Sequence, residues 1–216
     1  FSPLRACSGS TARDLRGITK TMHALLNDLR KGSQQLGLSL SEGVLLQLLA
    51  YQDQLHLWNK AYNLTAIRQP KDMLVKHVLD SLSIIPHLPA GRLLDVGTGG
   101  GLPGMVIAIC QPERECVLLD SNGKKIRFLV QTIADMKLPN VRAVQGRIED
   151  PTLRASLGHF EVITSRAFSS LLDFVRDTRD WLDPQGSLIA MKGVEPVEEM
   201  QQLTDFQCVS QRLTVP

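Results

Sequence analysis

Long apolar runs are absent from this 216-residue chain, and so is the continuous apolar block of a secretory signal near the amino terminus. A membrane-spanning helix needs about 20 consecutive apolar residues, so we expect no membrane partner and a cytoplasmic location. Cysteine is scarce as well, with four residues that form neither a C-x-x-C pair nor the short spacings of a zinc site. The sequence therefore predicts free thiols, with no disulfide framework and no metal centre.

Neither sign of charge dominates: the formal net charge is +2, with 21% charged and 43% hydrophobic residues. These values are typical of a globular domain and exclude disordered and collagen-like classes. The length suits one large or two small domains, and we expect a monomer. The first 90 residues hold ten Lys/Arg against six Asp/Glu. This excess is compatible with a polyanionic partner and equally with a solvated surface.

The pattern divides the chain into three parts. Residues 1–18 begin with Phe1, are rich in Ser, Thr and Arg, and predict a processed or disordered extension. Residues 19–88 predict a helical region, in which Ser39 and Glu42 have the spacing of a capping box. A further helix is expected to begin after Pro70 and to end at Pro86.

Residues 89–216 alternate between short aliphatic runs and helical stretches. The predicted strands are 92–96, 116–120, 141–145, 161–165 and 187–191, and the predicted helices are 103–111, 122–137, 169–182 and 195–203. Apolar runs without polar alternation are typical of parallel strands that are covered on both faces. We therefore predict an α/β fold, a doubly wound, mostly parallel Rossmann-like sheet with an N-terminal helical extension.

A glycine-rich segment, LDVGTGGGLPG at residues 94–104, follows the first predicted strand and precedes a helix. Gly97 and Gly99 allow a sharp turn and a close approach to a ligand. A dinucleotide fingerprint needs a third glycine where Leu102 stands, which weakens that reading. The alternative ligand is S-adenosylmethionine, because Asp95 would repel a pyrophosphate but would attract the ammonium and sulfonium groups of this donor.

Three further residues fit an adenosine in such a site. Asp120 ends the second predicted strand, where a carboxylate can accept both ribose hydroxyls, and we favour this role over the alternative of an ordinary helix cap. Ile148 and Glu149 follow the third strand and would flank the adenine, with a solvated loop as the alternative. The cofactor set predicted from the residues is thus Asp95, Gly97, Gly99, Asp120, Ile148 and Glu149, and the family resemblance given below adds Leu102 and Arg166.

The residues after the fourth strand, TSRA at 164–167, suggest which atom accepts the methyl group. The acidic-or-amide, Pro-Pro-aromatic motif of amino-group methylation is absent, as is a suitably placed cysteine for carbon methylation. A ring nitrogen such as N7 of guanine remains, since it has a free lone pair and needs no general base. Arg166 and Arg147 would hold guanine O6 or a phosphate as catalytic residues, and Lys192 would join Arg147 in binding the substrate. Exposed surface cations are the alternative for all three.

Two other features favour structural roles. His77 is expected on a helix surface or at a cap beside Asp80 rather than in catalysis. Trp58 and Tyr62 could stack on bases, but their helical spacing with Leu55 favours the core.

Six motifs in order resemble the bacterial glucose-inhibited division protein B family. They are WNKAYNLT at 58–65, HVLDS at 77–81, the glycine segment at 95–104, LDS at 119–121, SRAF at 165–168 and KG at 192–193. The resemblance spans roughly residues 36–216 and implies an S-adenosylmethionine-dependent methyltransferase of 16S ribosomal RNA. Its target would be N7 of one guanosine near the decoding centre, on naked RNA or on the small subunit.

The same resemblance implies that Gly97, Leu102, the Ile148–Glu149 pair and Arg166 line the cofactor pocket. The sequence ends at Pro216, before an Arg-His-Leu-Val strand that the family pattern leads one to expect, so we expect the last antiparallel strand to be missing. Two alternatives of other classes remain: a non-catalytic RNA-binding ribosome-assembly factor and a nicotinamide-dependent reductase.

Overall fold

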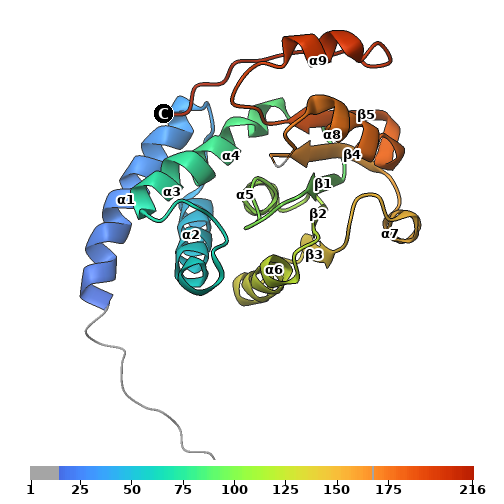
Figure 1. Ribbon diagram of the computed structural model, residues 1–216. Helices are drawn as coiled ribbons and strands as arrows, with labels where there is room; N and C mark the ends of the chain where they lie inside the picture. The colour runs from blue at the N-terminus through green and yellow to red at the C-terminus, as the bar shows by residue number, and fades with distance from the viewer. Residues whose placement is uncertain (1–14, 167) are drawn as a thin grey trace, which may run out of the picture.

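The computed structural model describes residues 15–166 and 168–216, with side chains from residue 24 onward (Figure 1). The predicted extension 1–18 lies largely outside this part, and the first helix begins at Leu15. The helices are α1 Leu15–Gln35, α2 Glu42–Tyr62, α3 Pro70–Met73, α4 Asp80–Ser83, α5 Gly104–Cys110, α6 Gly123–Met136, α7 Pro151–Leu157, α8 Leu171–Thr178 and α9 Val197–Gln202. A π-helical segment η1, Leu74–Leu79, joins α3 to α4, and two 3₁₀ turns are η2, Ile85–His87, and η3, Arg179–Trp181.

Five parallel strands form one sheet in the order β3-β2-β1-β4-β5. They are β1 Leu93–Val96, β2 Cys116–Asp120, β3 Val141–Gln145, β4 Phe160–Ser165 and β5 Leu182–Ala190. The chain builds outward from β1 to β3 and then returns to the other side of β1 with β4. This confirms the predicted doubly wound sheet, and its strand order reverses between β1 and β4, where ligands bind in such folds.

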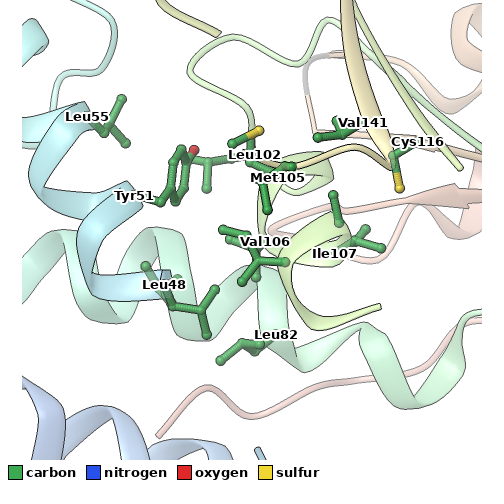
Figure 2. Close-up of a cluster of buried hydrophobic side chains, with 14 of the residues drawn as sticks. Leu48, Tyr51, Leu55, Leu82, Leu102, Met105, Val106, Ile107, Cys116 and Val141 are labelled. Carbon is green, nitrogen blue, oxygen red and sulfur yellow. The ribbon is translucent and has the colours of Figure 1, made fainter. Parts of the chain in front are cut away.

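Both faces of the sheet are covered, as the apolar runs predicted. Leu93 of β1 belongs to a buried cluster with the front helices and α5, whereas its neighbour Leu94 belongs to a second cluster with Phe174 and Trp181. Figure 2 shows the first cluster, in which Tyr51 and other side chains of α2 face those of α5. Because successive residues of a strand point to opposite faces, each strand contributes to both clusters.

Local capping explains where the longer helices begin and end. Ser41 caps α2 by accepting from the backbone N–H of Val44, so the predicted capping box at Ser39 is wrong by two residues, and Glu42 is the first helical residue. The helix then ends at Asn63, which has the left-handed φ of 50°. Asn122 caps α6 through its side-chain oxygen, which accepts from two backbone N–H groups of the first turn.

The predicted elements differ most from the observed ones in three places. The expected helix after Pro70 changes to π-helical geometry at Leu74, and Pro86 lies inside the turn η2 rather than after the helix end. Helix α7 was missed, although Asp150 caps it and Pro151 occupies its first position. Strand β5 begins five residues before its predicted start and pairs with β4 through an irregular register.

The last residues of the chain return to the helical front end (Figure 1). After α9, side chains of Leu213 and Val215 pack, partly buried, against the cluster that contains α1 and α2. Within the described part of the chain the sheet is parallel throughout, with no antiparallel strand after β5. No helix in these residues is long and apolar enough to cross a membrane.

Candidate active site

Two cavities open at the carboxyl ends of the strands and share Gly97. The strand-end cavity, about 320 Å³, is lined by Val96, Gly97, Leu119, Asp120, Ser121, Lys125, Gly146, Arg147, Ile148, Glu149 and Phe168. The front-end cavity, about 170 Å³, is lined by Leu55, Leu64, Thr65, Gly97, Thr98, Gly99, Gly100, Leu102 and Arg166. The first lies between strand ends, whereas the second lies between the helical front end and the glycine loop.

The glycine loop that separates the two cavities depends on left-handed backbone geometry. Gly97, Gly99 and Gly101 have φ values of 68°, 61° and 97°, which disfavour any residue with a side chain. A Cβ on Gly101 would also lie 2.5 Å from Met105 Cγ. Tyr51 of α2 donates its hydroxyl to the carbonyl oxygen of Gly100 at 2.6 Å. The loop is therefore held against the helical front end.

Asp95 lies beneath this loop and is completely buried. Its Oδ2 accepts from Thr98 Oγ1 at 2.6 Å and from the Gly104 backbone N–H at 2.9 Å, and its Oδ1 accepts from Thr164 Oγ1 at 3.4 Å. Burial raises its pKa to about 6, although these hydrogen bonds and the charge of Arg166 lower it. Asp95 lines neither cavity, and its hydrogen bonds hold the glycine loop in place. Its predicted contact with the methyl donor remains a prediction.

Asp120 lies at the end of β2 on the wall of the strand-end cavity and is 7% exposed. Its Oδ2 accepts from the backbone N–H of Gly99 at 2.9 Å, and its Oδ1 accepts from that of Asn122 at 2.8 Å. The ammonium of Lys125 lies 3.5 Å from Oδ2. The carboxylate thus connects the glycine loop to the start of α6.

Ile148 and Glu149 line the same cavity from the loop after β3. Ile148 is buried, and its carbonyl oxygen accepts from Trp181 Nε1 at 2.9 Å, which fixes the backbone there. Glu149 is exposed. The structure therefore brings Asp120, Ile148 and Glu149 together, as sequence reasoning anticipated, and adds Phe168 to the same wall.

Arg166 lines the front-end cavity and contacts the helical front end through one nitrogen. Its Nη1 donates to Asp80 Oδ2 at 3.2 Å and to the carbonyl oxygen of Lys76 at 3.3 Å. Leu102 and Gly99 line the same cavity. Arg147 is exposed and lines the strand-end cavity, so the two arginines do not share one cavity.

Lys192 follows β5, and its side chain is hydrogen-bonded to the loop after β4. Its ammonium donates to the carbonyl oxygens of Phe168 and Ser169, at 3.0 and 2.5 Å. Glu199 of α9 binds the other end of this loop, accepting from Ser170 Oγ at 2.8 Å and from the backbone N–H of Leu171. The two charged side chains therefore hold the loop that carries Phe168, while the predicted contact of Lys192 with substrate stays a prediction.

His77 differs from its expected position on the helix surface. It is 5% exposed, and its Nε2 lies 2.8 Å from Thr65 Oγ1. Burial and the nearby charge of Arg166 lower its pKa to about 4. The expected position on the helix surface is therefore wrong, because this side chain of η1 is buried against the segment that follows α2.

Several cavity residues were not among the predicted site residues. Thr65 and Phe168 are two of them, and both belong to motifs that carried the family resemblance. Trp58 and Tyr62 stack with ring centroids 5.2 Å apart and are partly buried against the front cluster, which supports their predicted core role. The structure contains no group of three or more His, Cys, Asp or Glu that could hold a metal ion, as far as the described residues show.

Comparison with known proteins identifies the relatives of this chain. A Ribosomal RNA small subunit methyltransferase G of Acinetobacter baumannii is 65% identical over 196 residues, which cover 90% of this chain and 93% of that protein. The protein of the same name from Psychrobacter cryohalolentis is 52% identical, over 89% of this chain and 79% of its own length. Among solved structures, the SAH-bound Podospora anserina methyltransferase PaMTH1 shares the fold, with a TM-score of 0.52 and 14% identity over 87% of this chain and 73% of that one.

The family described as rRNA small subunit methyltransferase G, or GidB, matches residues 45–215. This range contains β1–β5, both cavities and the glycine loop. The chain belongs to the GidB family of rRNA small subunit methyltransferases.

Proposed function

We propose that this protein transfers a methyl group from S-adenosylmethionine to N7 of a specific guanosine in 16S ribosomal RNA, near the decoding centre. One structural observation supports this most directly. A nearly buried carboxylate, Asp120, ends β2 beside a glycine loop with left-handed φ at Gly97 and Gly99, and all three line the two joined cavities. The rRNA methyltransferases to which the chain is related support the substrate class.

The residues of the strand-end cavity fit an adenosine. Asp120 offers a carboxylate for the ribose hydroxyls, and Ile148 and Phe168 offer apolar surface for the base. Glu149, at the rim, would accept a hydrogen bond from the exocyclic amine. A dinucleotide fits less well, because Leu102 stands where its fingerprint needs a third glycine, whereas the Asp120 carboxylate would suit the ribose of either cofactor.

The bound donor supplies a methyl group on a positively charged sulfur. Guanine N7 has a lone pair and no proton to lose, so the protein needs to orient the base and exclude water rather than remove a proton. Arg166 is placed for this task, since it lines the front-end cavity and its direction is set by Asp80 and the Lys76 carbonyl. We assign its guanidinium the role of a forked donor at the reacting end of the site.

The exposed Arg147 lies at the rim of the strand-end cavity, where it would contact RNA phosphate. The basic excess of the first 90 residues supports the same partner. Lys192 acts on the substrate in this proposal through the loop that it holds. The protein works on the ribosomal RNA in the cytoplasm, as a monomer.

The experiment is to incubate the protein with undermethylated small subunits and, separately, with deproteinised 16S RNA, using a methyl-labelled donor. The RNA is then cleaved chemically at N7-methylguanosine. We expect label at one guanosine, and the preferred substrate distinguishes naked RNA from the assembled subunit. Label on an adenosine, on a ribose hydroxyl or on several scattered guanosines would contradict the assignment, and absence of label with intact RNA binding would support an assembly factor instead.

A further inference from the structure

Helix α9 packs against α8 near the C-terminal end of the chain (Figure 1). None of its six residues is buried, so the helix adds little to the hydrophobic core. One of its side chains, Glu199, nevertheless reaches the start of α8 and accepts three hydrogen bonds there. This connection therefore needs a reason other than core packing.

Glu199 uses a single carboxylate oxygen for these bonds. Its Oε2 accepts from Ser170 Oγ at 2.8 Å and from the backbone N–H groups of Leu171 and Leu172, the latter at 3.2 Å. The first N–H groups of a helix have no partner within the helix, and a negative charge beside them is favourable. The bond from Ser170, the two backbone bonds and the nearby charge of Lys192 lower the pKa of Glu199, so its carboxylate is ionised at neutral pH.

Lys192 holds the same stretch of backbone from its other end. Its ammonium donates to the carbonyl oxygens of Phe168 and Ser169, whereas Glu199 accepts from N–H groups further along. Each charge thus meets peptide groups of opposite partial charge. The segment 168–172, here named the Phe168 loop, is therefore fixed at both ends.

The Phe168 loop forms part of the wall of the strand-end cavity. Phe168 lines this cavity together with Ile148, and its ring centroid lies 5.2 Å from that of Phe174. Phe174 is a buried residue of α8, the helix whose first turn Glu199 binds. Glu199 thus fixes both the backbone that carries the Phe168 ring and the helix against which this ring packs.

We propose that Glu199 is a positioning residue for the methyl donor, which holds the Phe168 ring at the wall of the strand-end cavity through the Phe168 loop. This inference rests on the proposed function, which assigns the adenosine of the donor to this cavity. Glu199 lines neither cavity and acts only through Phe168. The affected part of the donor is therefore the adenosine and not its amino-acid end.

The test measures calorimetric binding of S-adenosylhomocysteine and 5′-methylthioadenosine, which share the adenosine and differ in the amino-acid end. Glu199→Ala removes three hydrogen bonds at the loop and should weaken binding of both probes by about fivefold, the net value of one hydrogen bond. Glu199→Gln keeps an acceptor oxygen and should lose less affinity. Unchanged binding of both probes by Glu199→Ala, or weaker binding of S-adenosylhomocysteine alone, overturns the proposal.

The matched control is Glu198→Ala, which makes the same change at the neighbouring, exposed glutamate of α9. It should bind both probes as the parent does, and thermal unfolding verifies that each variant is folded. Equal weakening by Glu198→Ala and Glu199→Ala would assign the effect to the helix as a whole and would overturn the role of Glu199.

A double-mutant cycle shows whether Glu199 acts through Phe168. In the Phe168→Ala background, Glu199→Ala should change the affinity for either probe by less than about twofold, because residues that act on one contact are coupled. An equal loss in both backgrounds would show that Glu199 only stabilises the fold, and the proposal would fail.

Methylation of small subunits gives a second readout. Glu199→Ala should raise the KM of the donor by about fivefold and change kcat by less than about twofold, because Arg166 is held by other partners, Asp80 and the Lys76 carbonyl. A loss of folded protein would instead lower kcat at unchanged KM, and that result overturns the positioning role. If the parent binds neither probe, the proposed function itself fails, and this inference fails with it.

Discussion

The guanidinium of Arg166, directly after β4, donates to the carboxylate of Asp80 at the start of α4, with 3.2 Å between Nη1 and Oδ2. The two residues are 86 positions apart in the chain. Their contact joins the carboxyl edge of the sheet to the helical front end at the front-end cavity, which both parts line. The front end is therefore part of the site rather than an appended domain.

We expect Arg166→Lys to lower single-turnover methylation by about tenfold or more, equivalent to ~1.4 kcal/mol of lost alignment. Lysine keeps the charge but has no planar fork, so it cannot contact Asp80 and a ligand in the same fixed geometry. The matched control is Arg176→Lys, at a largely exposed arginine that pairs with Asp173 and Asp177 of its own helix. A rate for Arg166→Lys equal to that of the control would show that the fork is not needed.

Asp80→Asn should weaken S-adenosylhomocysteine binding by about two- to fivefold, the value of a partly exposed ion pair. The loss arises because Arg166 retains its carbonyl contact but has no carboxylate to hold its direction. Isothermal titration measures the change, with Asp180→Asn as a control on the exposed Arg154–Asp180 pair. Unchanged binding in Asp80→Asn would assign the orientation of Arg166 to the Lys76 carbonyl alone.

Asp120→Ala should reduce donor affinity by roughly 2–4 kcal/mol, because two hydrogen bonds to a charged acceptor are lost. The backbone N–H of Gly99 also loses its partner, so the glycine loop is expected to loosen. Calorimetry with the donor measures the effect, and Asp135→Ala, at an exposed position on α6, is the control. A variant that binds as tightly as the parent would contradict the ribose assignment.

Asp95 and His77 should give opposite pH dependence of stability. The folded pKa of Asp95 is raised to about 6, so its contribution is present below about pH 4 and is lost as the pH rises through 6. The folded pKa of His77 is lowered to about 4, so the folded state favours the neutral ring and stability rises between pH 4 and 6.5. The free energy of unfolding is measured with urea at several pH values, in the parent and in both variants. Asp95→Asn should remove the fall of stability with pH, and His77→Gln should remove the rise.

In that experiment, the parent-minus-variant difference should fall with pH for Asp95→Asn and rise with pH for His77→Gln. The Asp95 difference should span on the order of 2–3 kcal/mol, from the size of its pKa shift. The same sign for both variants would show that one of the two assignments is wrong.

Lys192→Met should weaken donor binding, because the carbonyl oxygens of Phe168 and Ser169 lose their shared donor and the loop beside the strand-end cavity loosens. The salt dependence of RNA binding should stay unchanged. Arg147→Ala should do the opposite, reducing the salt slope by about one while leaving donor affinity intact. Filter binding of RNA at several salt concentrations distinguishes the two variants. A reduced salt dependence of RNA affinity in Lys192→Met would show that Lys192 contacts phosphate directly.

The sheet was predictable because its signal is local. Strands β2 and β3 have the bounds that were predicted for them, and the glycine segment lies between a strand and a helix, as its composition indicated. The position of Asp120 at a strand end followed from the same pattern. The helix starts were harder, because Ser39 and Ser41 both precede Glu42 closely and only the observed backbone distinguishes the cap.

The sequence by itself determined the parallel sheet, the glycine loop and the strand-end residues, since these depend on the spacing of apolar and small residues along short segments. Only the tertiary structure decided that Asp95 is enclosed by three internal donors, that His77 is buried against Thr65, and that Lys192 holds a loop. Each of these depends on a partner from another part of the fold. The type of a polar residue does not tell whether its side chain contacts a ligand or another part of the protein. The contact between Arg166 and Asp80 is an example. It exists because folding brings the end of β4 close to the start of α4, and no local sequence pattern indicates that these two segments are neighbours.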